Sequence, residues 1–201
     1  MNFWLVTGFR IAGVCAALLP TIASAEPVDV QVPMRCTRGG DDTVFRATVT
    51  LPPSLPSGST FTVRIDSAPS GRVSHLGLHY IYGMTTQYLL PAGMHYIEGS
   101  AQVVPGTGTA NVRPGARAWH AASHVFLKLP AHVANGDHYT PPSLQFAVQV
   151  EEPAGMHVAL AFVRYEVMAN AILVGDVRTD CEPVPAPYRL ATLRVEPRTL
   201  P

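Results

Sequence analysis

The sequence predicts an all-β protein, a sandwich of about eight or nine short strands, and two observations carry the prediction. The 201 residues include 19 Pro and 16 Gly, which divide most of the chain into short segments. These segments of about 6–12 residues suit strands better than helices. Within them apolar and polar residues alternate, which is typical of strands with one face in water.

The clearest alternating segment covers residues 144–150, Leu-Gln-Phe-Ala-Val-Gln-Val. The other expected strands cover residues 28–32, 45–51, 61–65, 76–82, 97–103 and 125–129. Residues 156–173 are apolar enough to form a helix. Their Val content and the β context favour two strands that turn near Asn170, a buried central strand followed by a second one over residues 172–177.

The N-terminal residues 1–25 are expected to be a secretion signal. Arg10 is followed by an apolar run over residues 11–22, and Ala23-Ser24-Ala25 has the small-residue pattern of a cleavage site. The run is shorter than the about 20 residues of a membrane-spanning helix. We therefore expect an exported chain with no transmembrane anchor in its mature part. Retention of the segment and lipidation at Cys15 are the less favoured alternatives.

The rest of the chain is expected to be one domain over residues 26–182, an immunoglobulin-like β-sandwich. Residues 183–201 would form a Pro-rich tail or add a short edge strand. Once Cys15 leaves with the signal, Cys36 and Cys181 remain near the two ends of the domain. In an oxidising compartment two such cysteines usually pair, so we expect one disulfide. Two free thiols or an intermolecular bridge are the alternatives.

Short motifs add a resemblance. The run Tyr-Leu-Leu-Pro-Ala-Gly-Met-His-Tyr-Ile-Glu-Gly-Ser over residues 88–100 resembles a phrase of bacterial surface immunoglobulin-like modules. In that phrase a strand ends in Leu-Pro-x-Gly, and an aromatic-x-x-Gly-Ser turn follows. Residues 140–146 and 180–183 resemble uncharacterised secreted proteins of actinobacteria. The resemblance implies the sandwich fold and a cell-envelope setting, and it supplies no catalytic residue.

The charges and motifs exclude several classes of function. The chain has 14 Lys and Arg against 14 Asp and Glu, a balance that argues against nucleic acid as a partner. It has no G-x-S-x-G nucleophile elbow, and no Lys follows Gly106 and Gly108 as a phosphate loop requires. We therefore expect no catalytic residue and no cofactor.

Histidines are numerous, with eight in the chain, and two pairs have H-x3-H spacing: His75 with His79, and His120 with His124. On a helix this spacing suits zinc. On a strand the two rings of a pair would lie about 13 Å apart, at ~3.3 Å per residue. Neither pair could then chelate alone, and we expect no metal site.

An aromatic-rich stretch over residues 79–88 is the most distinctive segment. Its mixture of Tyr, Met and Gln would suit an adaptable binding loop. The candidate binding residues are Tyr80, Tyr82, Met84, Gln87 and Tyr88. A hairpin whose rings cover the edge of the core is the simpler interpretation.

Together these observations predict a secreted or cell-envelope protein that acts by non-catalytic binding. The partner would be an unknown protein, glycan or lipid of the envelope. A carrier that holds a small apolar ligand between its sheets is the alternative, and an apolar cavity in the structure would favour it. A hydrolase assembled from distant loop residues is the least favoured possibility.

Overall fold

The computed structural model describes residues 25–38, 43–69, 73, 76–104, 116–138 and 142–198, and these form 13 strands and no helix. In chain order the strands are β1 (Glu26–Cys36), β2 (Thr43–Leu51), β3 (Ser54–Pro56), β4 (Thr60–Ser67), β5 (Leu78–Leu89), β6 (Met94–Tyr96), β7 (Gln102–Val104), β8 (Arg117–Ala121), β9 (His124–Ala134), β10 (Ser143–Val150), β11 (His157–Ala171), β12 (Gly175–Pro183) and β13 (Tyr188–Glu196). The predicted all-β fold is confirmed. The count exceeds the prediction partly because β3, β6 and β7 have only 3 residues each, too few to show alternation.

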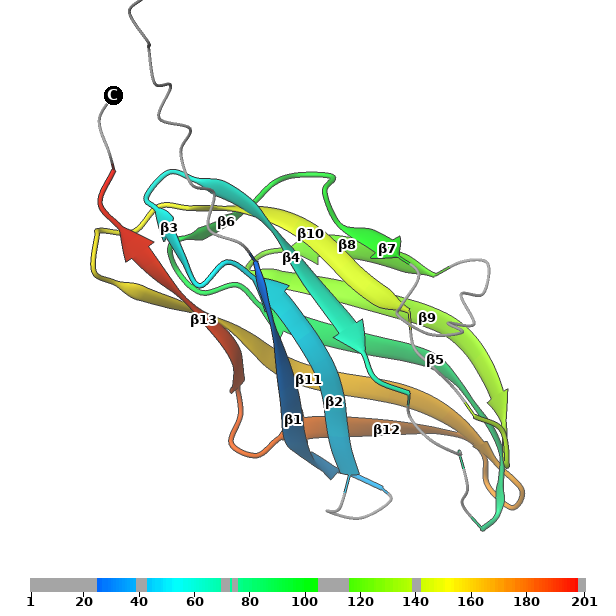
Figure 1. Ribbon diagram of the computed structural model, residues 1–201. Helices are drawn as coiled ribbons and strands as arrows, with labels where there is room; N and C mark the ends of the chain where they lie inside the picture. Colours follow the sequence, from blue (N-terminus) through cyan, green and yellow to red (C-terminus); the bar gives the residue numbers. More distant parts are fainter. Residues whose placement is uncertain are drawn as a thin grey trace, which may run out of the picture.

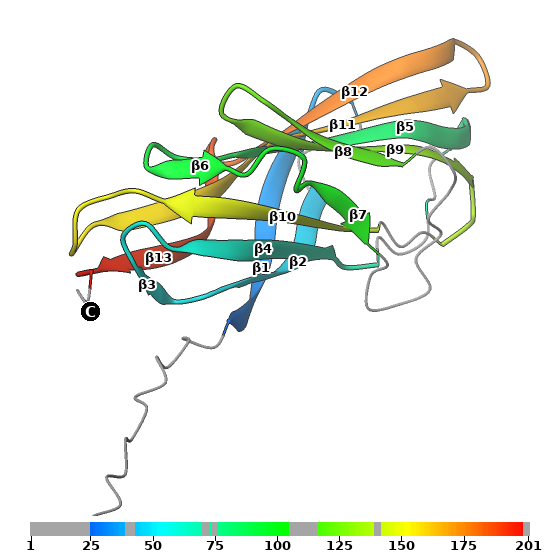
Figure 2. The ribbon, with the colours of Figure 1, turned by 90° about the horizontal axis from the view of Figure 1, so that it is seen from above.

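The strands pack in two layers, which Figure 1 shows face on and Figure 2 shows from above. One layer contains β10, β4, β2 and β1 in that order, with the short β6 and β7 paired to the outer edge of β10. The other contains β12, β11, β5, β9 and β8. Pairing between β1 and β12 is confined to residues 34–36 of β1, so the layers are joined at one corner. This arrangement is the predicted sandwich.

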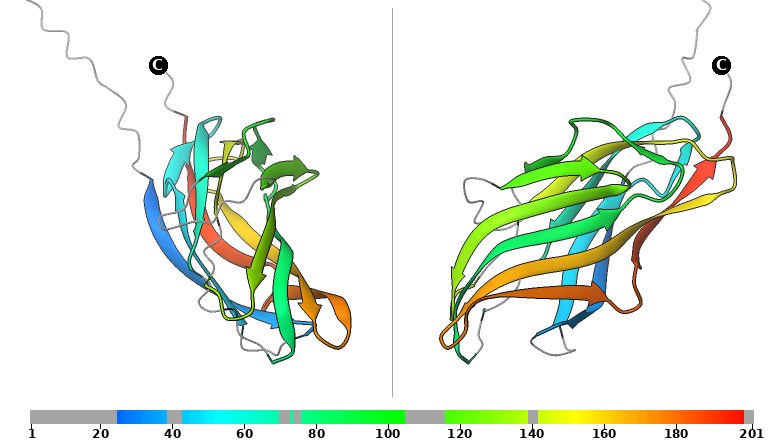
Figure 3. Two further views of the ribbon diagram at one scale, coloured as in Figure 1. Left: turned by 90° about the vertical axis from the view of Figure 1, so that its right-hand side faces the viewer. Right: turned by 180° about the vertical axis from the view of Figure 1, so that it is seen from behind.

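Strand β11 is the longest, and two partners share one of its edges. Strand β13 pairs with its first part, from His157 to Phe162, and β12 pairs with its second part, from Tyr165 to Ala171. Figure 3 shows red β13 and orange β12 along β11. Leu190 and Leu193 of β13 are buried. The C-terminal segment therefore forms a full strand of the sandwich, longer than the short edge strand that was expected as one of two options.

The core is filled by the apolar side chains that alternate with polar ones along the strands. In β10 the side chains of Leu144, Phe146, Val148 and Val150 are buried, and the residues between them are half-buried. Side chains from the two layers meet in one cluster. Burying a large apolar side chain stabilises a fold by roughly 1.5–3 kcal/mol. The period-two pattern read from the sequence therefore identifies the inner face of this strand correctly.

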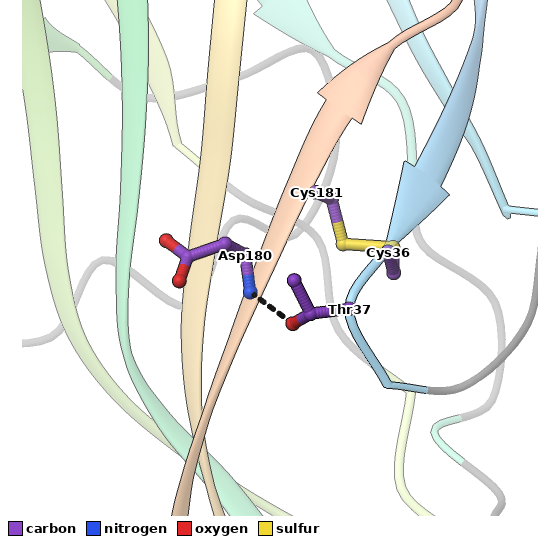
Figure 4. Close-up of a disulfide and its surroundings, with 4 residues drawn as sticks. All are labelled: Cys36, Thr37, Asp180 and Cys181. Atoms are coloured by element: carbon purple, nitrogen blue, oxygen red, sulfur yellow. Dashed lines mark hydrogen bonds between the residues drawn. A yellow bond between two sulfur atoms is a disulfide. The ribbon is translucent and has the colours of Figure 1, made fainter.

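The predicted disulfide is confirmed. Cys36 and Cys181 face each other across the β1–β12 pairing, and their sulfur atoms are bonded, as Figure 4 shows. Beside the bridge, Asp180 N donates to Thr37 Oγ1 at 3.2 Å, and Thr37 N donates to Asp180 O at 2.8 Å. The covalent bond thus locks the corner where the two layers are joined.

The turn after β11 differs from the prediction. Residues 156–173 do form a strand and not a helix, but the strand runs past Asn170 to Ala171. Residues 172–174, which were expected to begin the next strand, form the turn, and β12 starts at Gly175, whose φ is +72°. A left-handed residue is what such a turn needs, and Gly supplies it without steric strain. The backbone requirement therefore outweighed the β propensity of Ile and Val.

The predicted strand over residues 97–103 is correct only at its end, because residues 97–101 are not in a strand and residues 102–103 belong to β7. Ser100 N donates to Ile97 O at 3.1 Å, and Gly99 has a φ of +74°, so the chain turns here. Pairing with β10 resumes only in β7. Gly-Ser turn chemistry overrides the alternating pattern.

Within the described ranges, no helix is long and apolar enough to cross a membrane. The predicted signal over residues 1–25 lies outside the described residues apart from Ala25.

Candidate ligand cleft between the sheets

A cleft of about 220 Å³ lies between the two layers at one end of the sandwich. It is bounded by the start of β2, the end of β4 and the inner faces of β5 and β9. In Figures 1 and 2 this is the end toward which the arrow of β4 points. The described residues that line it are Met34, Thr43, Val44, Phe45, Arg46, Ser67, Ala68, Pro69, Val73, Ile81, Met84, Thr86, Leu127, Leu129 and Tyr165.

Most of this lining is apolar. Leu127 and Leu129 of β9 and Met84 of β5 form its buried inner wall. A dry apolar cavity of about 150 Å³ is known to take up a benzene-sized molecule. Pockets for larger ligands usually measure about 300–1,000 Å³. The cleft therefore fits a small apolar molecule or the apolar end of a larger one.

A bulge at Gly83 makes the inner face of β5 continuous. Ile81 and Met84 both line the cleft, although residues three apart point to opposite faces of a regular strand. The pairing of β5 with β11 shifts register here, because three steps along β5, from Tyr82 to Thr85, lie opposite two steps along β11, from Met168 to Glu166. Gly83, within this stretch of β5, has a φ of +58°. The extra residue of a bulge reverses the alternation. Apolar side chains therefore face inward on both sides of Gly83.

Two hydroxyl groups interrupt the apolar interior. Thr86 lines the cleft, and Tyr88 follows it on the same face of β5, fully buried. Burial raises the pKa of Tyr88 to about 12, although the nearby Thr86 hydroxyl opposes the shift. Neither hydroxyl has a well-aligned hydrogen-bond partner among the described residues. An unsatisfied buried hydroxyl costs about 1–3 kcal/mol, so a ligand atom that bonded to Thr86 would relieve that cost.

One charged side chain stands at the cleft. Arg46, at the start of β2, is exposed and is the charged residue among the described lining residues. No ion pair joins it to a described carboxylate. An apolar interior with a guanidinium beside it suits a molecule that has an apolar body and an anionic or polar end.

The predicted binding residues lie on strand β5 and not on a loop, and the bulge divides them. Met84 lines the cleft and Tyr88 is in the core. Tyr80, Tyr82 and Gln87 are half-buried and lie at alternate positions to the inward residues. The structure therefore brings only Met84 of the five to the cleft.

Tyr80 and Tyr82 form a small aromatic group near the start of β5. Their ring centroids lie 5.8 Å apart, and the Tyr80 ring lies 4.0 Å from that of His132. A hydrogen bond to Asp176 is the main cause that raises the pKa of Tyr82. This group ties β5 to β9 and to the start of β12.

The histidines are distributed over the sandwich. His120 stacks on Tyr96 at 4.2 Å, whereas His124 lies 6.1 Å from the ring of Phe126. His75 lies outside the described residues. Among the residues that the structure does describe, no three His, Cys, Asp or Glu side chains come close enough to hold a metal ion.

One buried carboxylate lies outside the cleft. Asp66 accepts hydrogen bonds from Arg64 Nε at 2.7 Å and Arg64 Nη2 at 2.8 Å, and from the hydroxyl of buried Ser143. Burial alone would raise the pKa of Asp66, but the hydrogen bonds from Arg64 and Ser143 outweigh it and the pKa is lowered. Asp66 therefore stays ionised and clamps the end of β4 to the start of β10.

Sequence reasoning missed Arg46, Ala68 and Thr86 as cleft residues. The alternation in residues 45–51 places Arg46 on the wet face, and nothing in the sequence shows that this face borders a cleft. The signal for Thr86 was available in part, because Gly83 inside a strand pattern suggests a bulge. With that bulge, Thr86 and Met84 fall on the same face as Ile81.

No protein-family model matches the chain. No curated protein matches it either. Solved structures with a similar arrangement include a membrane-anchored protein from Corynebacterium diphtheriae, with a TM-score of 0.49 and 14% identity. The match covers 88% of this chain, which spans 38% of that one.

Two further structures belong to other kinds of protein. A cohesin in complex with a dockerin from Clostridium thermocellum has a TM-score of 0.43 and 9% identity over 72% of this chain and 89% of that one. The major pilin subunit of Bacillus cereus has a TM-score of 0.41 and 12% identity over 85% of this chain and 40% of that one. Similarity at this level assigns no partner and no activity.

Proposed function

We propose that this protein is a non-catalytic binding protein of the extracytoplasmic space that holds a small ligand in the cleft between its sheets. The ligand has an apolar body and an anionic or polar end. The observation that carries the proposal is the apolar cleft itself, with Thr86 unsatisfied inside and Arg46 beside it. The disulfide supports an oxidising compartment, as does the expected signal over residues 1–25.

The test uses two fluorescent probes that share one ring system. N-phenyl-1-naphthylamine is neutral, and 1-anilinonaphthalene-8-sulfonate adds an anionic sulfonate. Both should bind with enhanced emission. Ala68→Trp, which fills the cleft, should abolish binding of both probes, because Ala68 lines the cleft and is only half-buried. Ala121→Trp on exposed β8 is the matched control and should leave both affinities unchanged.

Substitution of the charged residue at the cleft should affect the two probes differently. Arg46→Gln should weaken binding of the sulfonate probe by about tenfold, the equivalent of 1.4 kcal/mol, and leave the neutral probe unchanged. Equal binding of both probes by the wild type, Ala68→Trp and Ala121→Trp would contradict a ligand site in the cleft. Thermal unfolding of each variant in parallel separates loss of binding from loss of fold.

A further inference from the structure

The turn between β11 and β12 exposes three consecutive apolar side chains. Ile172, Leu173 and Val174 have 59%, 93% and 68% of their surface exposed. Leu76, 98% exposed, precedes Gly77, whose carbonyl accepts a hydrogen bond from Ile172 N at 2.8 Å. We call these four residues the apolar tip. Clustered exposed apolar residues commonly mark a site of interaction.

The apolar tip stands at the far end of a projecting hairpin. Figures 2 and 3 show the β11–β12 hairpin extending beyond the layer that contains β1, β2 and β4. It lies at the same end of the sandwich as the cleft, which includes Ile81 near the start of β5 and Val73. Val73 is bonded to the turn that follows β9, where Gly136 N donates to Val73 O at 2.6 Å.

The side chains of this hairpin become less polar from its stem to its tip. Its stem carries ion pairs, with Arg178 Nη2 at 2.7 Å from Glu166 Oε2 and 3.0 Å from Asp180 Oδ1. Nearer the tip, Asn170 Nδ2 donates to Asp176 Oδ1 at 2.7 Å. The aromatic pair of β5 lies at this level, since Tyr80 is the pairing partner of Asn170. The apolar tip lies beyond this level, at the end of the hairpin.

The order of charged, aromatic and apolar side chains matches the order of the layers at a bilayer surface. Water and charged headgroups lie outermost, the interfacial layer favours Tyr, and hydrocarbon lies beneath. A stable protein–protein contact needs about 800 Å² on each partner, and four aliphatic side chains on a convex turn fall short of that area. Residues 76–82, 132–138 and 168–177 contain no Lys or Arg. These three segments therefore offer no basic side chain to anionic lipid, and their insertion would be driven by apolar burial.

We propose that the apolar tip inserts into the boundary between headgroups and acyl chains of a lipid bilayer and holds the sandwich against a membrane surface. The Tyr80–Tyr82 pair then lies among the headgroups, and the charged stem stays in water. The cleft would open toward the same membrane. This inference goes beyond the proposed function, and the experiments that test the two are independent.

The first measurement is flotation of the full chain with phosphatidylcholine vesicles. Leu173→Asp should lower the bilayer partition constant by about tenfold or more, because a charged residue is strongly disfavoured in the bilayer. Met156→Asp is the matched control. Met156 is 51% exposed and precedes β11 at its opposite end, so its substitution should change nothing. The N-terminal apolar run is common to all variants and contributes an equal background.

The second measurement reports how deeply the apolar tip enters the bilayer. A Trp at the tip, Leu173→Trp, should shift its emission to the blue on vesicle addition and be quenched by lipids brominated on their acyl chains. The same reporter at the other end, Met156→Trp, should do neither after subtraction of the wild-type signal. Binding should persist in 0.5–1 M salt, at which the Debye length is only about 3–4 Å.

Absence of a blue shift at Leu173→Trp, or equal flotation of Leu173→Asp and the wild type, would overturn the proposal. A concentration-dependent dimer that Leu173→Asp abolishes, without any vesicle binding, would assign the tip to a second copy of the chain instead. Probe binding in the cleft is unaffected by either result, so each proposal can fail alone.

Discussion

The side chain of Asp66 illustrates how a buried charge is tolerated in this sandwich. Its carboxylate is 11% exposed and would be costly to bury alone. Two donors on Arg64 and the Ser143 hydroxyl satisfy it instead. This cluster could not be predicted from the sequence, because nothing in the segment around residue 66 shows that Ser143 lies beside it.

Asp66 should therefore make stability depend on pH. Its pKa is lowered in the folded state, so its contribution is present above the ordinary Asp pKa of about 4 and is lost as pH falls through the lowered value. Asp66→Asn should cost about 1–2 kcal/mol at pH 7, since Arg64 is partly screened by solvent.

Urea unfolding at pH 7 and pH 2.5 would measure this. The difference between the wild type and Asp66→Asn should shrink at the lower pH. Asp29→Asn is the control, because Asp29 accepts an exposed hydrogen bond from Thr48 and should contribute little at either pH. A constant difference at both pH values would show that Asp66 is not ionised in the folded protein.

At the level of elements, alternation predicted the strands well and failed where the backbone must turn or bulge. From Leu144 to Val150, strand β10 follows the period-two pattern, with buried and half-buried residues in strict alternation. Strand β5 does not, because one extra residue relative to β11, at Gly83, moves Met84 and Thr86 to the face of Ile81. That residue brings Met84 and Thr86 to the wall of the cleft. A strict period of two, with no bulge, would place Tyr80, Tyr82 and Met84 on the same face of the strand, which is not what the structure shows.

Gly83→Ala should test this element directly. A Cβ at position 83 would lie 3.5 Å from Met168 Cγ, an ordinary contact, so steric overlap is small. The φ of +58° is what Ala disfavours, at about 1–2 kcal/mol. We expect a loss of stability in that range by thermal or urea unfolding.

Gly83→Asn is the matched variant, because Asn tolerates the left-handed region better than Ala. It should be less destabilised than Gly83→Ala. If the two variants unfold alike, the bulge does not require a left-handed residue. Weaker binding of the neutral probe by Gly83→Ala would link the bulge to the shape of the cleft.

For the whole molecule, the sequence allowed the sandwich and its disulfide to be predicted, whereas the cleft could not be. Cysteine number and compartment were enough for the pairing of Cys36 with Cys181. The cleft depends on which strands become neighbours and where the two layers separate. The arrangement of the strands arises from contacts between residues that are distant in the sequence. The periodicity within one segment contains no information on which strands become neighbours.

The disulfide should stabilise the whole sandwich by restricting the unfolded chain. A loop with a sequence separation of 145 is long, and such bridges typically contribute about 2–4 kcal/mol. Replacing both cysteines, Cys36→Ala with Cys181→Ala, should lower the melting temperature by several degrees or more. The variant should keep its β-rich circular dichroism.

The reduced wild type should melt like the double variant, which controls for the substitutions themselves. Alkylation of the unreduced protein should label neither cysteine. An unchanged melting temperature in the double variant would mean that the corner between β1 and β12 is held without the bridge.

The pairing of β1 with β12 has a consequence for how the chain reaches this fold. The first strand pairs with β2 early in the chain, but its second neighbour is residues 181–183. Strand β11 acquires its last partner only with β13. During synthesis, these contacts form only after nearly all of the chain has emerged. Topologies dominated by such distant pairings fold slowly, in milliseconds to seconds. The chain therefore cannot complete its fold while it is being made, a state that would suit the export expected from residues 1–25.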